Sequence, residues 1–246
     1  EAQSFDMRSI AAWKDAFDVA RQNGNLHSKL EHLYGTDTGF LEDRSGGWRR
    51  LLDFAAPVLG KDAPVLLVRA PGRINLMGRH VDHQGGHCNL MTTNRELLAI
   101  LHPRQDDAVN LVNLDADRYP DRQISIRALA EQFPQPDWLD VIDSPQARAL
   151  SREYAGDWVQ YARAAVLRLQ KEFRDIPLRG MDLIVDGTIP AAAGLSSSSA
   201  LVVTVAEALL AANHIQVEPQ RLVELCGEGE WFVGTRGGSA DHAAIK

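Results

Sequence analysis

One stretch of the sequence places a strand, a loop of small residues and an apolar helix in direct succession. Residues 181–186 alternate side chains with a period of two, as in a β-strand with one face against a core. Residues 200–212 are then almost entirely apolar, and only two polar side chains interrupt the run. A helix this apolar has to be held in the core of the protein, next to the strand that leads to it.

The loop between strand and helix has the composition of an anion-binding segment. Residues 189–200 read Ile-Pro-Ala-Ala-Ala-Gly-Leu-Ser-Ser-Ser-Ser-Ala. The first amides of a helix have no intrahelical partner, and the helix dipole favours negative charge there. Small residues admit a phosphate chain, and serine hydroxyls bind phosphate or Mg²⁺. We therefore expect a phosphate site at Gly194, Leu195, Ser196, Ser197, Ser198 and Ser199, with Ser198 as the metal ligand. The alternative is a serine-capped buried helix, for which one serine suffices.

Two common nucleotide motifs are absent from this loop. It lacks the Gly-x-x-x-x-Gly-Lys-Ser/Thr order of a P-loop and the Gly-x-Gly-x-x-Gly order of a dinucleotide fold.

A second polar segment lies upstream, in residues 69–95. Arg73, Asn75, Arg79, His80 and Asp82 stand among glycines that allow close backbone approach. Crowded donors, acceptors and charges of this kind suit a small polyhydroxylated substrate. A hydrophilic turn rich in glycine is the alternative interpretation.

The third segment, residues 232–242, presents an acidic residue, Asp241, after the glycine pair Gly237-Gly238. Such a carboxylate is a plausible general base. Aspartate beside glycine is also common in turns, so this segment alone carries little weight.

In this order and spacing the three segments resemble the GHMP kinase superfamily, and within it the galactokinase group. Residues 70–82 are similar to the opening signature Ala-Pro-Gly-Arg-Val-Asn-Leu-Ile-Gly-Glu-His-x-Asp. Residues 190–200 are similar to the Pro-x-x-x-Gly-Leu-Ser-Ser-Ser loop, and residues 237–242 to the segment that carries the catalytic aspartate. The resemblance implies an α+β lobe like domain 2 of ribosomal protein S5 over residues 61–246, preceded by a helical N-terminal segment over residues 1–60.

The resemblance also implies the reaction and the roles of individual residues. It implies transfer of the γ-phosphoryl group of ATP, with Mg²⁺, to the anomeric hydroxyl of galactose or a related monosaccharide. Asp241 would take the proton of that hydroxyl or favour its loss, and Arg73 would steady the transferring group. The sugar would contact Arg79, His80, Asp82 and Gly238.

Two positions depart from the family signature. Arg79 replaces a glutamate that holds sugar hydroxyls, and His83 replaces a tyrosine. Arg79 inverts the charge and adds donors, which weakens the assumption of galactose and makes a uronic acid conceivable. It is equally compatible with a guanidinium that turns away to pair with an acid of the fold. A silent sugar and ATP sensor, or a kinase for a non-sugar alcohol, are the remaining alternatives.

Composition and length limit the other possibilities. A net charge of −7 argues against general nucleic-acid binding, and no apolar run is long enough for a membrane span. Two distant cysteines fit a reduced, cytoplasmic protein. The segment that shapes the phosphate site in the second lobe of such kinases does not follow Asp241. We therefore expect an N-terminal lobe without its C-terminal lobe, inactive alone, and self-associating through the bared cleft face.

Two further expectations concern segments outside the motifs. The polar, glycine-containing residues 36–47 predict a loop between helices. The prolines within residues 129–150 predict an irregular excursion at the surface.

Overall fold

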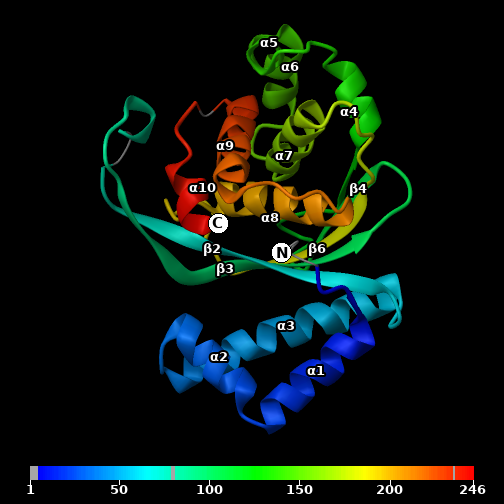
Figure 1. The fold of residues 1–246 in the computed structure, drawn as a ribbon, viewed down its shortest axis with the longest axis vertical. Helices are drawn as coiled ribbons and strands as arrows, with labels where there is room; N and C mark the ends of the chain where they lie inside the picture. Colours follow the sequence, from blue (N-terminus) through cyan, green and yellow to red (C-terminus); the bar gives the residue numbers. More distant parts are fainter. Residues whose placement is uncertain (1–4, 79–80, 235) are drawn as a thin grey trace.

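One mixed six-stranded sheet runs through the middle of the molecule (Figure 1). The structure is a computed structural model that describes residues 5–78, 81–234 and 236–246. The described strands follow the spatial order β1-β2-β3-β6-β4-β5. Neighbours are antiparallel except β4 and β6, which are parallel. The strands are β1 (Arg8–Ser9), β2 (Pro64–Met77), β3 (Asn89–Pro103), β4 (Ala108–Asn113), β5 (Arg122–Ser125) and β6 (Met181–Gly187).

Helices cover both faces of this sheet. One face carries three N-terminal helices, and the other carries the helices that follow β5 (Figure 1). The first group is α1 (Ile10–Gln22), α2 (Asn25–Tyr34) and α3 (Thr38–Leu59). The second is α4 (Ile126–Gln132), α5 (Trp138–Asp143), α6 (Pro145–Glu153), α7 (Val159–Glu172), α8 (Ser197–Ala212), α9 (Pro219–Glu230) and α10 (Ala240–Ile245), with short 3₁₀ turns η1 (Asp82–Gln84) and η2 (Trp231–Val233). The mixed α+β class expected from the sequence is confirmed.

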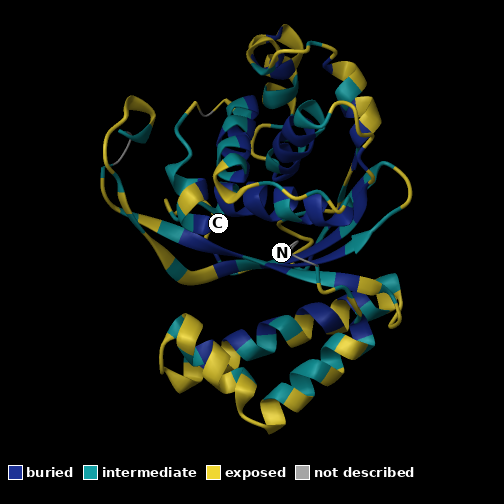
Figure 2. Cartoon of the chain, viewed as in Figure 1, coloured by how far each residue is buried: buried dark blue, intermediate teal, exposed yellow. Residues whose placement is uncertain are grey.

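Two separate apolar cores follow from this layering. Alternate residues of β2 and β3 face opposite layers, since successive strand side chains point to opposite sides. Val68 and Leu101 face the larger core around α7 and α8, whereas Val65 and Ile100 face the smaller core under α1 and α3. The buried positions in Figure 2 concentrate in the sheet, α7 and α8, and the outer surfaces of α1 and α2 are exposed.

The expected loop over residues 36–47 is wrong, because α3 begins at Thr38. The side chain of Asp37 caps that helix by accepting the amide of Phe40 at 3.0 Å. Leu41 and Gly47 are both buried. A Cβ on Gly47 would stand 3.2 Å from Leu98 Cδ1, so glycine there allows α3 to approach β3 closely. Tertiary packing has overridden the weak helix propensity of this stretch.

The expected surface excursion over residues 129–150 is also wrong for most of its length. It contains the end of α4, all of α5 and most of α6. Phe133, Val141 and Ala147 are buried in the larger core. Pro145 does not break α6, because it occupies the first turn, where a missing N–H costs nothing, and Ser144 caps it.

Candidate functional site

The conformation of β2 aims Arg73 at the side of the sheet opposite to that of Arg69. Residues four apart on a regular strand share a face. Here Pro71 pairs with Glu96 but Arg73 pairs with Thr92, so β3 holds two extra residues at this point. The Thr93 hydroxyl closes this bulge by donating to the Arg95 carbonyl at 3.1 Å. Beyond this irregularity Arg73 lies toward α8 and α10, where it contacts Asp241, while Arg69 contacts Tyr34 on the side of α2.

Arg73 meets Asp241 directly. Its Nε donates to Asp241 Oδ1 at 2.5 Å, and its Nη2 pairs with Oδ2 of the same carboxylate. This two-point contact fixes both side chains in one plane. Asp241 lies in the first turn of α10, so it is presented by a helix and not by the glycine-rich turn that we expected.

The serine-rich loop reaches the same two side chains. The main-chain N–H of Arg73 donates to the Leu195 carbonyl and its Nη1 to the Gly194 carbonyl, both at 3.1 Å. The Ser196 hydroxyl donates to Asp241 Oδ2 at 2.6 Å. Ser196 precedes α8 in a left-handed conformation with φ of 54° and makes no side-chain cap. The serine-cap interpretation therefore does not describe Ser196, whose hydroxyl faces Asp241 instead of the helix amides.

The glycine-rich segment before α10 packs on Asp82. The amide of Ala240 donates to Asp82 Oδ2 at 3.2 Å. A Cβ on Gly238 would collide with the Asp82 carboxylate, so a larger residue there would displace the Asp82 side chain. Burial alone would raise the pKa of Asp82, but the amide donors of Ala240 and His83 outweigh it and hold the pKa below its usual range.

Two of the expected sugar contacts, Arg79 and His80, lie outside the described residues. All the other site residues predicted from the sequence lie in one connected group. Hydrogen bonds join Arg73, Asp241, Gly194, Leu195 and Ser196. The amide of Ala240 connects this group to Asp82, against which Gly238 packs. The helix α8 begins beside the group with Ser197, Ser198 and Ser199.

Sequence reasoning missed one carboxylate of this group, Glu230 at the end of α9. The Ser199 hydroxyl donates to Glu230 Oε1 at 3.0 Å, and Glu230 as a whole residue is 9% exposed. Burial raises the pKa of Glu230 to about 7, and the Asp241 carboxylate acts in the same direction. Nothing in the sequence separates Glu230 from Glu224 and Glu228, the partly exposed glutamates of α9, because only the fold buries it.

His242, the residue after Asp241, lies beneath the site. It is 1% exposed, and neither ring nitrogen has a hydrogen-bond partner among the described residues. Its Nε2 stands 3.7 Å from Glu230 Oε2. Burial lowers the pKa of His242 to about 4, which favours the neutral imidazole.

The oxygen atoms beside α8 suit a hard divalent cation. The hydroxyls of Ser198 and Ser199 and the carboxylate of Glu230 lie together at its first turn. Hydroxyl and carboxylate oxygens are the ligands that Mg²⁺ prefers, usually with waters and phosphate oxygens completing the shell. No cluster of three or more His, Cys, Asp or Glu side chains able to hold a metal occurs in the described part of the chain.

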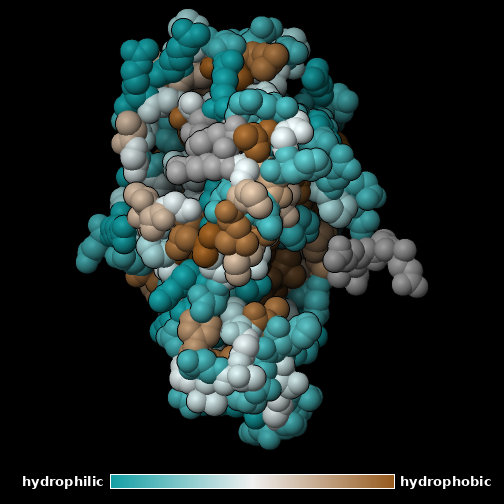
Figure 3. Space-filling view, turned by 90° about the vertical axis from the view of Figure 1, so that its left-hand side faces the viewer, coloured by the Kyte–Doolittle hydropathy of each residue, from teal (hydrophilic) through white to brown (hydrophobic). Residues whose placement is uncertain are grey.

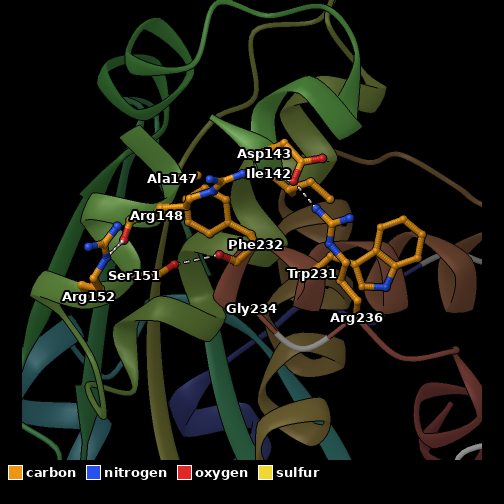
Figure 4. Close-up of a pocket in the computed structure, with 10 residues that line it drawn as sticks. All are labelled: Ile142, Asp143, Ala147, Arg148, Ser151, Arg152, Trp231, Phe232, Gly234 and Arg236. Atoms are coloured by element: carbon orange, nitrogen blue, oxygen red, sulfur yellow. Dashed lines mark hydrogen bonds and ion pairs between the residues drawn. The ribbon is translucent and has the colours of Figure 1, made fainter. Parts of the chain in front are cut away.

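Two pockets lie on either side of Trp231, whose indole N–H donates to the Gly237 carbonyl at 2.9 Å. One has a volume of about 490 Å³ and is lined on one side by Asp82, His83 and Gly238. The other, of about 350 Å³, lies between α5, α6 and η2 and contains the Asp143–Arg236 ion pair shown in Figure 4. The second pocket holds none of the expected site residues.

Exposed apolar side chains cluster on the hairpin of β2 and β3. Leu76 is 57% exposed and Met77 68%, and Ile74 and Met91 are exposed beside them. Figure 3 looks onto the end of the molecule where this hairpin lies in Figure 1, and apolar surface is visible near the middle of that view. Within the described residues no helix is both long and apolar enough to cross a bilayer.

Two family models match the chain at the segments that form this group. The model for the GHMP kinases N terminal domain matches residues 160–246, and the galactokinase galactose-binding signature matches residues 56–103. The chain belongs to the GHMP kinase superfamily. The first match contains the serine-rich loop and Asp241 of this GHMP kinase chain, and the second contains Arg73 and Asp82.

Curated galactokinases are similar to this GHMP kinase chain. That of Chloroflexus aurantiacus is 31% identical over 180 residues, which cover 73% of this chain and 40% of that protein. That of Bacillus subtilis is 27% identical over 191 residues, covering 77% of this chain and 43% of that protein. The chain thus spans about two fifths of the length of these relatives.

Solved structures show the same fold. Lactococcus lactis galactokinase complexed with galactose aligns with a TM-score of 0.63 at 24% identity, over 80% of this chain and 45% of that one. Methanococcus jannaschii mevalonate kinase aligns with a TM-score of 0.55 at 14% identity, over 73% of this chain and 50% of that one. At these identities the likeness establishes the fold of the GHMP kinase chain and no substrate.

Proposed function

We propose that the protein containing this chain transfers the γ-phosphoryl group of ATP to the anomeric C1 hydroxyl of galactose or a related monosaccharide. The observation that supports it most is the contact of Arg73, Asp241 and Ser196 at the start of α8. A charged pair and an anion-binding helix N-terminus are the components that phosphoryl transfer needs, because positioning and charge neutralisation supply most of its catalysis.

In this proposal Asp241 acts on the sugar. The C1 oxygen forms a bond to the γ-phosphorus, the bond from that phosphorus to the bridging oxygen of ADP breaks, and the hydroxyl proton passes to the Asp241 carboxylate and then to solvent. Arg73 holds Asp241 in place through two N–H groups. Its guanidinium cation would lie beside the γ-phosphoryl group during transfer. No covalent enzyme intermediate is required.

ATP and Mg²⁺ would lie at the start of α8. The amides after Gly194 and the hydroxyls of Ser196, Ser197, Ser198 and Ser199 would bind the phosphates. Ser198 and Glu230 would hold Mg²⁺, which neutralises charge on the β- and γ-phosphates when it is bound. The hydrogen bond from Ser199 to Glu230 supports this arrangement, because it already keeps a carboxylate beside the serine hydroxyls.

The sugar would contact Asp82 and Gly238. The 490 Å³ pocket beside them, and the amide of Ala240 that ties Asp82 to the residue before Asp241, support this position. Arg79 and His80 follow β2 along the chain and complete the proposed set. The positive charge of Arg79 leaves open a uronic acid as the substrate.

We also propose a division of the chain, at the boundaries given by its sequence. Residues 1–60 would be a helical N-terminal extension, and residues 61–246 the ATP- and sugar-binding lobe. The helices α1 to α3 fall within the first range. The free cysteines Cys88 and Cys226 are consistent with the cytoplasmic location that we propose.

A substrate screen tests the proposal. The longest natural protein that carries this chain is incubated with ATP and Mg²⁺ and a panel of neutral hexoses, uronic acids, mevalonate and homoserine, and ADP release is measured. We expect release with at least one monosaccharide and a product phosphorylated at C1, identified by ³¹P NMR. Turnover confined to mevalonate or homoserine, or no turnover at all, would contradict the proposal.

A further inference from the structure

A buried polar cluster joins the N-terminal helices to the sheet. Its centre is Glu96 of β3, which is 1% exposed. The Tyr34 hydroxyl at the end of α2 contacts both carboxylate oxygens of Glu96, at 2.7 and 2.6 Å, and Arg69 of β2 forms an ion pair with it. Arg44 of α3 is 5% exposed and reaches Glu96 Oε1 at 3.7 Å. Two helices and two strands therefore meet at a single carboxylate.

The same cluster holds the start of the serine-rich loop. Arg44 Nη1 donates to the Thr188 hydroxyl oxygen at 2.9 Å. The amide of Thr188 donates to the Glu96 carbonyl at 2.8 Å, and the amide of Glu96 donates to the Thr188 hydroxyl oxygen at 3.0 Å. Thr188 directly follows β6 and begins the segment that leads to Gly194 and Ser196. Its position is thus fixed by a side chain from α3.

The cluster also lies next to the part of β2 that leads to Arg73. Arg69 is bound to Tyr34 and Glu96 on the side of α2. On β2, the irregular pairing lies between Pro71 and Arg73, just after Arg69. On β3, the same irregular stretch follows Glu96 and contains Arg95 and Thr93. Both parts of the site, Arg73 on β2 and the serine-rich loop after β6, therefore lie within a few residues of this cluster.

Stability alone is a weak explanation for such a cluster. Burying charges costs several kcal/mol for each ion, and well-packed apolar side chains of similar volume are often as stable or more so. Directional bonds to a single threonine instead specify one position for the chain. The cost of this cluster is therefore best understood as the cost of a defined geometry.

We infer that Tyr34 and Arg44 are positioning residues of the site, through which α2 and α3 set the place of the serine-rich loop and of Arg73. The inference rests on the proposed function for its consequence in catalysis. Arg44 acts on the loop through Thr188, and Tyr34 acts on β2 and β3 through Arg69 and Glu96. Neither side chain touches a substrate. The N-terminal helices are in this way part of the phosphoryl-transfer apparatus.

Kinetics of Tyr34→Phe and Thr188→Val test the inference in the longest natural protein that carries this chain. Each variant keeps its shape and loses hydrogen bonds. We expect kcat/KM for ATP to fall about tenfold, as for one lost hydrogen bond to a charged partner, at temperatures well below the melting transition. Arg49→Gln is the matched control, because it breaks the exposed pair of α3 with Asp18 and should leave kcat/KM unchanged.

A second measurement separates this inference from the proposed function. Amide hydrogen exchange of residues 189–199 is followed by mass spectrometry without any substrate. We expect about tenfold faster exchange in Tyr34→Phe and Thr188→Val, with exchange in α7 unchanged. Unaltered exchange and unaltered kinetics would overturn the positioning role, even in an active kinase. Faster exchange in a protein with no sugar kinase activity would uphold it and reject only the proposed function.

Discussion

Arg73 and Asp241 hold each other in the two-point contact on which the proposed chemistry depends. Asp241→Asn keeps the shape of the side chain but removes the charge and the proton acceptor, and Arg73→Ala removes the cation. In the longest natural protein we predict that kcat falls by roughly 10² or more in each variant, as for lost acid–base and electrostatic contributions. Steady-state ADP release with the preferred sugar is the measurement.

The exposed Asp140 of α5 supplies the control for this prediction, since Asp140→Asn removes an equal charge away from the site. Sugar binding, measured by calorimetry, should persist in Asp241→Asn. Turnover close to that of the unaltered protein in either site variant would remove the residue from the mechanism.

Glu230 and His242 should give opposite pH dependence of stability. Between about pH 4 and 6.5 the unfolded chain holds a proton on His242 that the folded chain lacks, so the unfolding free energy rises with pH. Between about pH 4.5 and 7 the folded chain holds a proton on Glu230 that the unfolded chain has lost, so the unfolding free energy falls with pH. The two effects largely cancel in the unaltered chain.

Single substitutions should reveal each effect. In Glu230→Gln the unfolding free energy should increase from pH 4.5 to 6.5. In His242→Gln it should decrease from pH 5 to 7. Each change should be roughly 1–3 kcal/mol. Urea unfolding in EDTA, at closely spaced pH values, measures both. The double variant is the control and should be nearly flat. Parallel curves for the two single variants would mean that neither group is shifted.

The sequence predicted most residues of the candidate site because each occupies a motif. Arg73, Asp82, Gly238, Asp241 and the four serines were predicted in this way, and the structure brings them together. Glu230 and the cluster around Glu96 could not be found. They matter because they are buried and because their partners, such as Tyr34 and Thr188, are distant in sequence. Local sequence patterns indicate neither burial nor distant partners.

Among the elements, the approach of β4 to β6 depends on one glycine. A Cβ on Gly180, the residue before β6, would collide with the main chain of Ala108 at the start of β4. The amide of Gly180 also donates to the Asp106 carbonyl at 2.6 Å, so the backbone has little room to shift. We predict that Gly180→Ala lowers the unfolding free energy by about 2–4 kcal/mol, as a backbone clash in a packed sheet does.

Gly237→Ala is the matched control for this element, because nothing lies within 4 Å of the added Cβ. Its unfolding free energy should stay within about 0.5 kcal/mol of the unaltered chain, as for most unconstrained sites. Thermal and urea unfolding measure both variants. Equal stability of the two would show that β4 and β6 separate easily at this point.

The elements themselves were predicted unevenly, for physical reasons. The apolar run that became α8 was found because a fully buried helix leaves an unmistakable pattern. The first half of α3 was taken for a loop, since its glycines and polar residues lower helix propensity. Burial of Leu41, the close approach of Gly47 to Leu98 of β3 and the cap at Asp37 outweigh that propensity. The helices α5 and α6 were missed because their prolines and aspartates act as helix starts.

At the scale of the whole molecule, the exposed hairpin predicts self-association. Leu76 and Met77 together present apolar surface that water solvates poorly. For residues 1–246 alone we predict concentration-dependent dimers or larger species in sedimentation velocity, and Leu76→Asp with Met77→Asp should abolish them. Val58→Asp is the control, because Val58 of α3 is equally exposed at 57%. Monomers at every concentration would contradict the prediction.

The chain's length relative to its relatives leads to a further prediction. The Chloroflexus aurantiacus galactokinase is matched over 40% of its length. Residues 1–246 alone should therefore fold, bind ATP weakly and show no sugar-dependent ADP release, since part of a nucleotide site rarely suffices. Calorimetry and the ADP assay check this, with the longest natural protein as the control. Sustained turnover by residues 1–246, with longer protein excluded by mass spectrometry, would contradict it.

The bulge opposite Pro71 and Arg73 bears on which insertions and deletions this lineage can accept. Removing the two extra residues of β3 would restore a regular ladder and abolish the irregular stretch of strand beside which Arg73 contacts Asp241. Chain length between Pro71 and Glu96 is therefore bound to the position of the bulge. Insertions and deletions should accordingly be rare within this hairpin.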